Sequence, residues 1–149
     1  MQSFKNILIP TDFSPAAWNA MQYGMLFQQM HKCPITLLHV YPIKTKYGAL
    51  KNGQAKEVED IVESLKRKMD RLSDNIEKAR GSNVVNVVRT GNVVDEIINF
   101  YRDGEFDLII MGVNSGSSSN SPGFNAGEII KNFGFPVFLV PATQEEKVA

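Results

Sequence analysis

Cysteine is nearly absent from this chain, since Cys33 is the only one among 149 residues. A single cysteine cannot form an internal disulfide, which excludes a disulfide-rich secreted scaffold and a cysteine-rich zinc module. A net charge is also missing, because 16 Lys and Arg balance 16 Asp and Glu. Since sequence-independent affinity for nucleic acid comes from many basic contacts to phosphates, this balance argues against a nucleic-acid-binding protein.

Long apolar runs are lacking as well. The longest, such as 108–111, are far shorter than the ~20 residues that a membrane-spanning helix needs. The first run, 7–9, is closely followed by Pro10 and Asp12, so it is too short for the core of a signal peptide. The chain, with 43% hydrophobic residues, is therefore expected to be a cytoplasmic protein that does not associate with membranes.

Five short apolar runs, several of them rich in β-branched residues, recur along the chain. They are too short for helices and several are apolar at successive positions, which is typical of strands in a covered, mostly parallel sheet. The predicted strands are 7–9, 35–40, 84–88, 108–111 and 137–140.

Helical patterns fill the gaps between these runs. Between positions 57 and 80, apolar residues fall on one stripe at steps of three and four, which predicts an amphipathic helix with a charged outer face. Ser14 is a good N-cap and precedes a proline, which favours the first helical position. The predicted helices run from Pro15 to about Met30, from about Glu57 to Arg80, onward from the cap Asn92, and onward from near Asn125.

The alternation of strands and helices predicts a single α/β domain over residues 1–149. Its expected architecture is an open five-stranded parallel sheet with helices on both faces. Three segments are expected to be irregular: a polar excursion at 43–55, a Gly/Ser loop at 113–124 and a tail at 143–149.

The Gly/Ser loop follows the fourth predicted strand. In an open α/β sheet, ligands bind beyond the carboxyl ends of the strands, where the strand order reverses. Glycines let backbone N–H groups approach an anion, and the N-terminus of a following helix favours negative charge. The composition predicts a phosphate-binding loop, and the alternative is a flexible surface loop with no ligand.

No glycine occurs in the turn after the first strand, which disfavours a Rossmann dehydrogenase, and neither a Walker loop nor a Gly-x-Ser-x-Gly elbow is present.

Other motifs occur in a specific order along nearly the whole chain. They are Ile-Leu-Ile-Pro-Thr-Asp-Phe-Ser at 7–14, Leu-Leu-His-Val at 37–40, Gly91 ahead of an Asp-Glu-Ile-Ile helix, Asp-Leu-Ile-Ile-Met-Gly at 107–112 and Pro-Val-Phe-Leu-Val-Pro at 136–141. Together they resemble the universal stress protein family.

The resemblance implies the strand order 3-2-1-4-5, within the Rossmann-like folds that bind adenine nucleotides. It also implies a homodimer joined through the last strand. The strand residues concerned are Val137, Phe138, Leu139 and Val140.

Nucleotide-binding positions are implied in the same way. Asp12 is expected beside the ribose or a Mg²⁺ ion, Pro10 and Thr11 near the base, and the backbone of Val40 at the adenine edge. The full set is Pro10, Thr11, Asp12, Val40, Met111, Gly112, Gly116, Gly127 and Glu128. Asp12 also has a local structural interpretation, in which its carboxylate forms an Asx turn leading into the helix capped by Ser14, and both roles can hold at once.

The glycine pattern departs from that of family members that bind ATP, which carry Gly-x-x-Gly, nine residues, then Gly and Ser or Thr. Here Ser115 replaces the second glycine, ten residues separate Gly116 from Gly127, and Glu128 takes the hydroxyl position. Asn125 and Glu128 resemble a capping box, whose carboxylate supplies the negative charge that a phosphate would bring. Two like charges about 4 Å apart repel by roughly 1–4 kcal/mol. Glu128 therefore either blocks the nucleotide or helps to hold its Mg²⁺.

Three functions remain open. The first is a regulatory stress-response protein that binds ATP or another adenine nucleotide with Mg²⁺. The second is a nucleotide-free homodimer that docks a partner protein. The third is a slow nucleotide hydrolase that uses Asp12 and Mg²⁺. Since the loop carries no basic residue, any nucleotide is expected to depend on Mg²⁺ and to bind modestly.

Several residues with reactive or aromatic side chains are expected to be structural instead. His39 lies within a predicted strand and favours a hydrogen-bonded core histidine over a catalytic base. Cys33 is expected to be a small buried residue. Trp18, Tyr23 and Phe27 have helical spacing and are expected to pack against the core.

Overall fold

The structure is a computed structural model that describes residues 4–43, 54–80, 84–113, 129, 131 and 134–141. Over these ranges, strands and helices follow one another in the order that the sequence predicts. The strands are β1 (Ile7–Pro10), β2 (Ile35–Pro42), β3 (Val84–Gly91), β4 (Leu108–Val113) and β5 (Val137–Pro141). The helices are α1 (Pro15–His31), α2 (Gln54–Arg80) and α3 (Val93–Asp103).

The strands form one parallel sheet with the order β3-β2-β1-β4-β5. This confirms the predicted fold class and strand order. Strands β2 and β3 follow β1 on one side of the sheet, whereas β4 and β5 lie on the other side of β1. The strand order therefore reverses between β1 and β4. Ligands in open α/β sheets bind beside the carboxyl ends of the strands at such a reversal.

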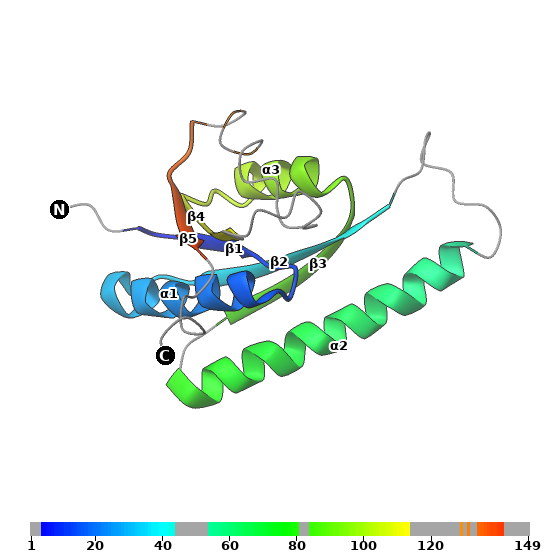
Figure 1. The fold of residues 1–149 in the computed structure, drawn as a ribbon, viewed down its shortest axis with the longest axis horizontal. Coiled ribbons are helices and arrows are strands. Elements are labelled where there is room, and N and C mark those ends of the chain that lie inside the picture. The colour runs from blue at the N-terminus through cyan, green and yellow to red at the C-terminus, as the bar shows by residue number, and fades with distance from the viewer. Residues whose placement is uncertain are drawn as a thin grey trace, which may run out of the picture.

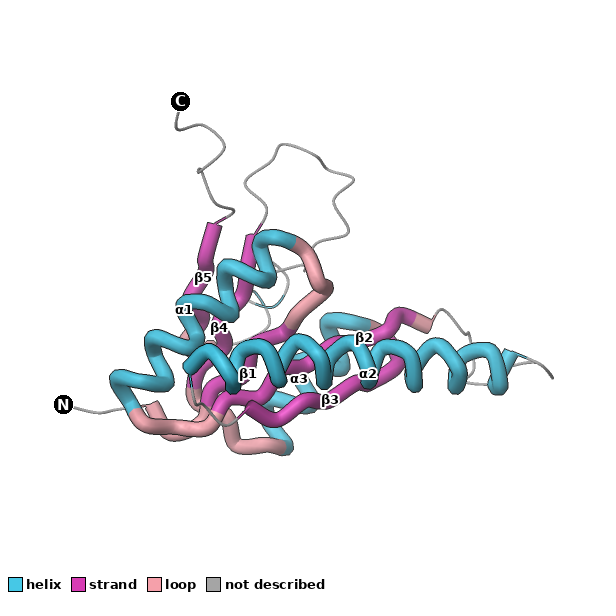
Figure 2. Tube along the Cα trace, turned by 90° about the horizontal axis from the view of Figure 1, so that it is seen from below, coloured by secondary structure: helices cyan, strands magenta, loops and turns pink. Residues whose placement is uncertain are grey.

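Helices cover both faces of the sheet. Helices α1 and α2 lie on one face and α3 on the other (Figure 1). Figure 2 shows α2 running along β3, which is an edge strand of the sheet. None of the helices in the described ranges is both long enough and apolar enough to cross a membrane.

Some element boundaries differ from the predicted ones. Helix α2 begins at Gln54, two residues inside the segment 43–55 that was expected to be irregular, and β4 includes Val113, the first residue of the expected Gly/Ser loop. Strand β3 continues to Gly91 because its pairing with β2 extends through Pro42. Residues 114–124 of the loop, the start of the last predicted helix and the tail 143–149 lie outside the described residues.

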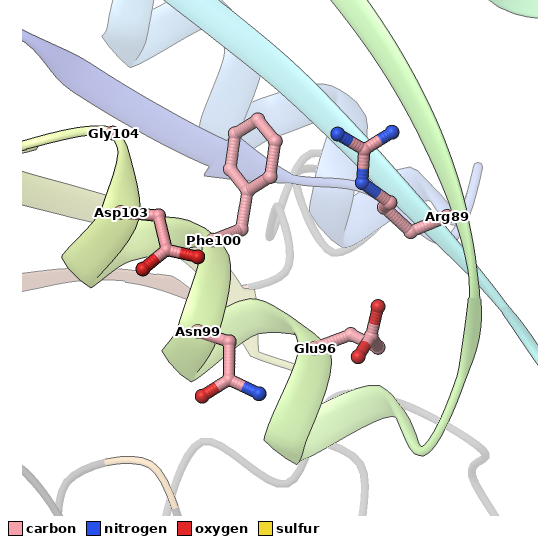
Figure 3. A pocket seen from close by; sticks show the side chains of 6 residues that line it. All are labelled: Arg89, Glu96, Asn99, Phe100, Asp103 and Gly104. Atoms are coloured by element: carbon pink, nitrogen blue, oxygen red, sulfur yellow. The ribbon is translucent and has the colours of Figure 1, made fainter.

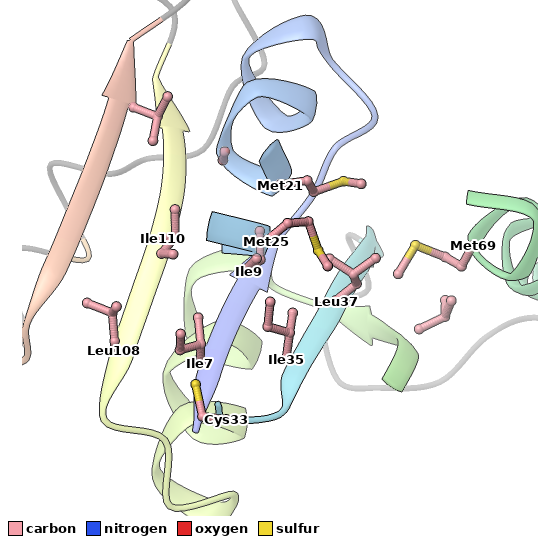
Figure 4. Packing of buried hydrophobic residues seen from close by; sticks show 13 residues of the cluster. Ile7, Ile9, Met21, Met25, Cys33, Ile35, Leu37, Met69, Leu108 and Ile110 are labelled. Carbon is pink, nitrogen blue, oxygen red and sulfur yellow. The ribbon is translucent and has the colours of Figure 1, made fainter. Parts of the chain in front are cut away.

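The core between the sheet and helices α1 and α2 consists of aliphatic and sulfur-containing side chains (Figure 4). Met21 and Met25 are the buried methionines that α1 contributes to this core, and Met69 is the fully buried contribution of α2. Cys33 is buried in the same cluster, and burial, with Asp107 nearby, raises the pKa of its thiol. A thiol held protonated in an apolar site is a packing residue, as the sequence predicts.

A second core lies between the sheet and α3. Val94, Ile97 and Tyr101 form the buried stripe of this helix, which is capped by the Asn92 side chain accepting from the Asp95 N–H at 3.0 Å. Burial, and secondarily Asp107, raises the pKa of Tyr101 to about 12. Tyr101 is therefore neutral at physiological pH and acts as a packing residue.

Asn86 explains why a polar residue interrupts the apolar run of β3. Its amide Nδ2 donates to the Met69 carbonyl at 3.2 Å, to Asp70 Oδ1 at 3.1 Å and to Ser73 Oγ at 2.6 Å. The acceptors at Met69 and Asp70 lie on one turn of α2 and the acceptor at Ser73 on the next. The long helix is therefore attached to the edge strand by hydrogen bonds as well as by apolar contacts.

The packing predicted for the aromatic residues of α1 holds only in part. Phe27 is half-buried against the core, but the side chains of Trp18 and Tyr23 are 44% and 45% exposed. Helical spacing alone does not determine which flank of a surface helix faces the sheet, and α1 carries apolar residues on several sides.

Candidate functional site

The turn that joins β1 to α1 is held by its own side chains. The Thr11 side chain is buried, and its Oγ1 accepts from the Phe13 N–H at 3.1 Å. The Thr11 N–H donates to the Leu38 carbonyl at 2.8 Å, which ties the turn to β2. The Thr11 N–H and hydroxyl oxygen are therefore both engaged within the protein.

Asp12 forms the Asx turn that the sequence offers as its structural role. Its Oδ1 accepts from the Ser14 N–H at 2.9 Å, and Ser14 Oγ in turn accepts from the Ala17 N–H at 3.1 Å as the N-cap of α1. The Asp12 side chain is only half-buried, and its second oxygen has no partner among the described residues. Within the described part of the chain, this second carboxylate oxygen is therefore unengaged.

Phe13 adopts a left-handed backbone conformation with φ of 65°. This region is disfavoured for a residue with a bulky side chain, so the surrounding structure must hold it. The Phe13 ring lies 4.7 Å from the ring of His39, centroid to centroid, and the ammonium of Lys68 lies 4.1 Å from its centroid. Residues of β2 and α2 therefore contact the turn from outside it.

His39 is hydrogen-bonded, as the sequence predicts, but it is half-buried rather than part of the buried core. Its Nδ1 lies 2.8 Å from the Thr11 carbonyl, and because a carbonyl only accepts, Nδ1 carries the hydrogen. Burial is the main influence on its pKa, which lies below the usual value; the Thr11 carbonyl and Asp12 oppose this shift and Lys68 adds to it. The ring is therefore held in its neutral form near pH 7.

The predicted residues of the neighbouring strands reach the same edge. Pro10 is paired with Leu38, two residues before Val40, and Gly112 lies on β4, across the strand-order reversal. The side chains of Val40 and Met111 are buried in the core beneath α3. At these two positions only backbone atoms are placed to face a ligand.

Gly112 is required by the close approach of α1. A Cβ at this position would overlap the carbonyl group of Ala16 and lie 2.8 Å from the Ala17 nitrogen. The first turn of α1 therefore packs its backbone directly against the end of β4. This contact fixes the start of α1, and with it the Asp12 turn, against the strand that leads into the Gly/Ser loop.

Three predicted site residues, Gly116, Gly127 and Glu128, lie outside the described residues, so the departures from the family glycine pattern are not placed. In the part of the chain that is described, no three His, Cys, Asp or Glu residues come together as ligands for a metal ion. Any Mg²⁺ at this edge would complete its octahedral shell with water or phosphate oxygens in addition to the Asp12 carboxylate.

A hollow of about 460 Å³ lies between β3 and α3 and shares no residue with the predicted site. Arg89 enters it from β3, and its guanidinium lies 5.4 Å from the Phe100 ring centroid (Figure 3). The other lining residues are Glu96, Asn99, Asp103 and Gly104. This lining carries charges of both signs and a single aromatic ring.

The sequence did not reveal two features of the site, the backbone conformation of Phe13 and the contact of Lys68 with its ring. The left-handed conformation of Phe13 has no sequence signal, because the position carries neither glycine nor asparagine. Lys68 is one of many charged residues on the outer face of α2, and its place over Phe13 depends on how α2 packs on the sheet.

Comparison with known proteins agrees with this architecture. A model of the universal stress protein family matches residues 3–141. Universal stress protein MJ0577 from Methanocaldococcus jannaschii is 31% identical over 124 residues, which cover 73% of this chain and 76% of that protein.

Solved structures give the same picture. UspA from Lactobacillus plantarum has a TM-score of 0.76 at 19% identity, with 94% of this chain and 99% of that chain covered. A universal stress protein family protein from Arabidopsis thaliana with AMP bound has a TM-score of 0.65 at 16% identity, with 95% and 94% covered. Since the family model spans nearly the whole sequence, the chain belongs to the universal stress protein family.

Proposed function

We propose that this protein binds ATP or another adenine nucleotide, together with Mg²⁺, at the carboxyl edge of the sheet between β1 and β4. The observation that carries the proposal is the half-buried Asp12 carboxylate, which is fixed at the strand-order reversal with one oxygen left without a partner among the described residues. The bound AMP in the Arabidopsis thaliana relative supports this ligand class.

The residues present fit such a ligand. Mg²⁺ is a hard cation that is commonly held by one or two carboxylates and by phosphate oxygens, and Asp12 offers one carboxylate oxygen. When bound, Mg²⁺ would offset the repulsion between the phosphates and this carboxylate. Backbone groups of Val40 and Gly112 are expected to face the nucleotide. Roles for Pro10, Thr11 and Met111 near the base, and for Gly116, Gly127 and Glu128 at the phosphates, remain predictions.

The change Asp12→Asn tests this site. Asparagine keeps an oxygen that accepts from the Ser14 N–H, so the turn is retained while the charge is lost. We expect the affinity for ATP with Mg²⁺ to fall about tenfold, which corresponds to about 1.4 kcal/mol. Isothermal titration calorimetry with and without EDTA measures both the loss and the dependence on Mg²⁺.

The matched control is Asp74→Asn, which removes the same charge from an exposed position on α2. It should bind as the wild type does. A wild-type protein whose melting temperature and heat signal do not change with millimolar ATP and Mg²⁺ would contradict nucleotide binding, since a ligand at 100 times its dissociation constant stabilises by ~2.7 kcal/mol. ADP release in the same samples, lost in Asp12→Asn, would show that the bound nucleotide is also slowly hydrolysed.

A second proposed function is homodimerisation through β5. Six of the seven exposed large apolar side chains of the described residues lie on α1 or β5. Phe138 and Leu139 of β5 are 36% and 39% exposed, and β5 is an edge strand of the sheet. An exposed apolar edge is a hazard for aggregation unless it is covered, and a second copy of the same strand can cover it by symmetry.

The change Phe138→Lys is expected to yield a monomer, because it places a charge at the centre of the apolar edge. The matched control is Val85→Lys, which adds the same charge to the opposite edge strand at a side chain that is 54% exposed. Sedimentation velocity gives the masses, and circular dichroism verifies that both variants fold. A dimer that persists in Phe138→Lys, or a wild type that is already monomeric, would rule out this interface.

A further inference from the structure

The turn that contains Asp12 has a strained backbone conformation at Phe13. Phe13 has a φ of 65°, and neither a glycine nor an asparagine relieves this conformation. Hydrogen bonds inside the turn link Thr11 to Phe13 and Asp12 to Ser14. Bonds of this kind also form in free peptides that sample several turn conformations, so they do not by themselves select a single one.

Two side chains from distant parts of the chain add the missing constraint. His39 of β2 donates from Nδ1 to the Thr11 carbonyl at 2.8 Å and places its ring 4.7 Å from that of Phe13. Lys68 of α2 places its ammonium 4.1 Å from the Phe13 ring centroid, within the range of a cation–π contact. The turn is therefore contacted both by the neighbouring strand and by the long helix.

We propose that His39 is a positioning residue that, together with Lys68, holds Phe13 and thereby fixes the Asp12 carboxylate in its orientation for ligand binding. The positioning of Asp12 for a ligand rests on the proposed nucleotide function, whereas the stabilisation of the turn by His39 and Lys68 does not. Neither side chain needs to touch the nucleotide. A site that is populated only a fraction of the time binds more weakly by that same fraction, so loosening the turn lowers affinity without removing a ligand contact.

The matched pair of variants is His39→Leu and His39→Asn. Leucine fills much of the space but has no hydrogen-bond donor, whereas the asparagine amide can place a donor near the position of Nδ1. In His39→Leu we expect hydrogen exchange at the Phe13 and Ser14 amides to accelerate about tenfold, and the affinity for ATP with Mg²⁺ to fall by a similar factor. His39→Asn should restore both to within about threefold of the wild type.

Lys68 gives a second pair that leaves the core intact. Lys68→Met removes the charge above Phe13 but keeps the aliphatic stem, and Lys66→Met makes the same change two residues away on the exposed face of α2. The first should accelerate exchange at Phe13 and weaken binding, and the second should do neither. These variants keep the proposal testable even if His39→Leu does not fold.

The pH dependence of stability tests whether the His39 ring is neutral in the folded protein. The groups facing His39 are Asp12 from the turn and Lys68 from α2. Because burial lowers the His39 pKa in the folded state, the unfolded chain binds the proton more readily, and stability is lost as pH falls through about 6.5 toward the folded-state value. The wild type should show this loss, and His39→Asn should lack it.

The outcomes separate the two proposals. If the wild type does not bind ATP, the nucleotide function is rejected. Faster hydrogen exchange at Phe13 in His39→Leu would still support stabilisation of the turn by His39. Unchanged hydrogen exchange at Phe13 in both His39→Leu and Lys68→Met would show that neither side chain stabilises the turn. If the wild type binds ATP, and the variants exchange faster at Phe13 but bind ATP with unchanged affinity, the proposal that His39 and Lys68 position Asp12 is overturned.

Discussion

Replacing Gly112 by alanine is expected to destabilise the protein by about 3 kcal/mol or more. Overpacking a tightly packed site costs about 1–3 kcal/mol when side chains can adjust, and occasionally more. Here the added Cβ meets the Ala16 carbonyl and the Ala17 nitrogen, which are backbone atoms of the first turn of α1. Backbone atoms cannot move to another rotamer, so α1 must shift away from β4.

Two other glycines provide controls for the same substitution. At Gly24 an added Cβ overlaps only the tip of the Ile9 side chain, and alanine favours a helix by about 0.8–1.0 kcal/mol over glycine. At Gly134 nothing lies within 4 Å. We expect a loss below about 1.5 kcal/mol for Gly24→Ala and a change within about 0.5 kcal/mol for Gly134→Ala.

Urea denaturation of the three variants measures these differences. At about 2–4 °C per kcal/mol for a chain of this size, Gly112→Ala should also melt well below the other two. Equal midpoints for Gly112→Ala and Gly134→Ala would show that the approach of α1 to β4 is not as close as described.

The fold was predictable because its determinants are local and repetitive. Successive apolar residues mark the buried strands, as at Leu108–Ile110, and caps such as Ser14 and Asn92 mark the helix starts. Periodicity alone does not order the strands in the sheet. The order followed from the family resemblance, since pairing between β1 and β4 joins residues about a hundred positions apart.

The candidate site was predictable only where a residue acts on its neighbours in sequence. The Asx turn of Asp12 and the cap at Ser14 depend on residues two and three positions away. The contacts of Phe13 with His39 and Lys68 depend on how β2 and α2 pack around the turn. Asn86 is a similar case, because its three acceptors on α2 have no counterpart in the pattern of β3.

The second large predicted effect on stability comes from removing the buried side chain that attaches α2 to the core. Met69 is the fully buried residue in the described part of this helix, and its side chain enters the core cluster that contains Leu37 (Figure 4). Truncating a buried methionine to alanine costs about 2–5 kcal/mol, through lost apolar contacts and the cavity that remains. We expect Met69→Ala to lose about 3 kcal/mol of unfolding free energy in urea.

Two controls isolate the buried contact from other effects of the substitution. Met69→Leu preserves volume and should cost less than about 1.5 kcal/mol. Lys66→Ala introduces alanine into the same helix at an exposed side chain, whose ion pair with Glu63 spans 3.7 Å and contributes about 0.3–0.5 kcal/mol at most. Since the Asn86 bond to the Met69 carbonyl survives every side-chain change at position 69, a loss in Met69→Ala reports the apolar contact alone. Equal stability of Met69→Ala and Lys66→Ala would mean that the Met69 side chain contributes little, and that the Asn86 hydrogen bonds and the partly buried Val62, Leu65 and Leu72 hold α2 instead.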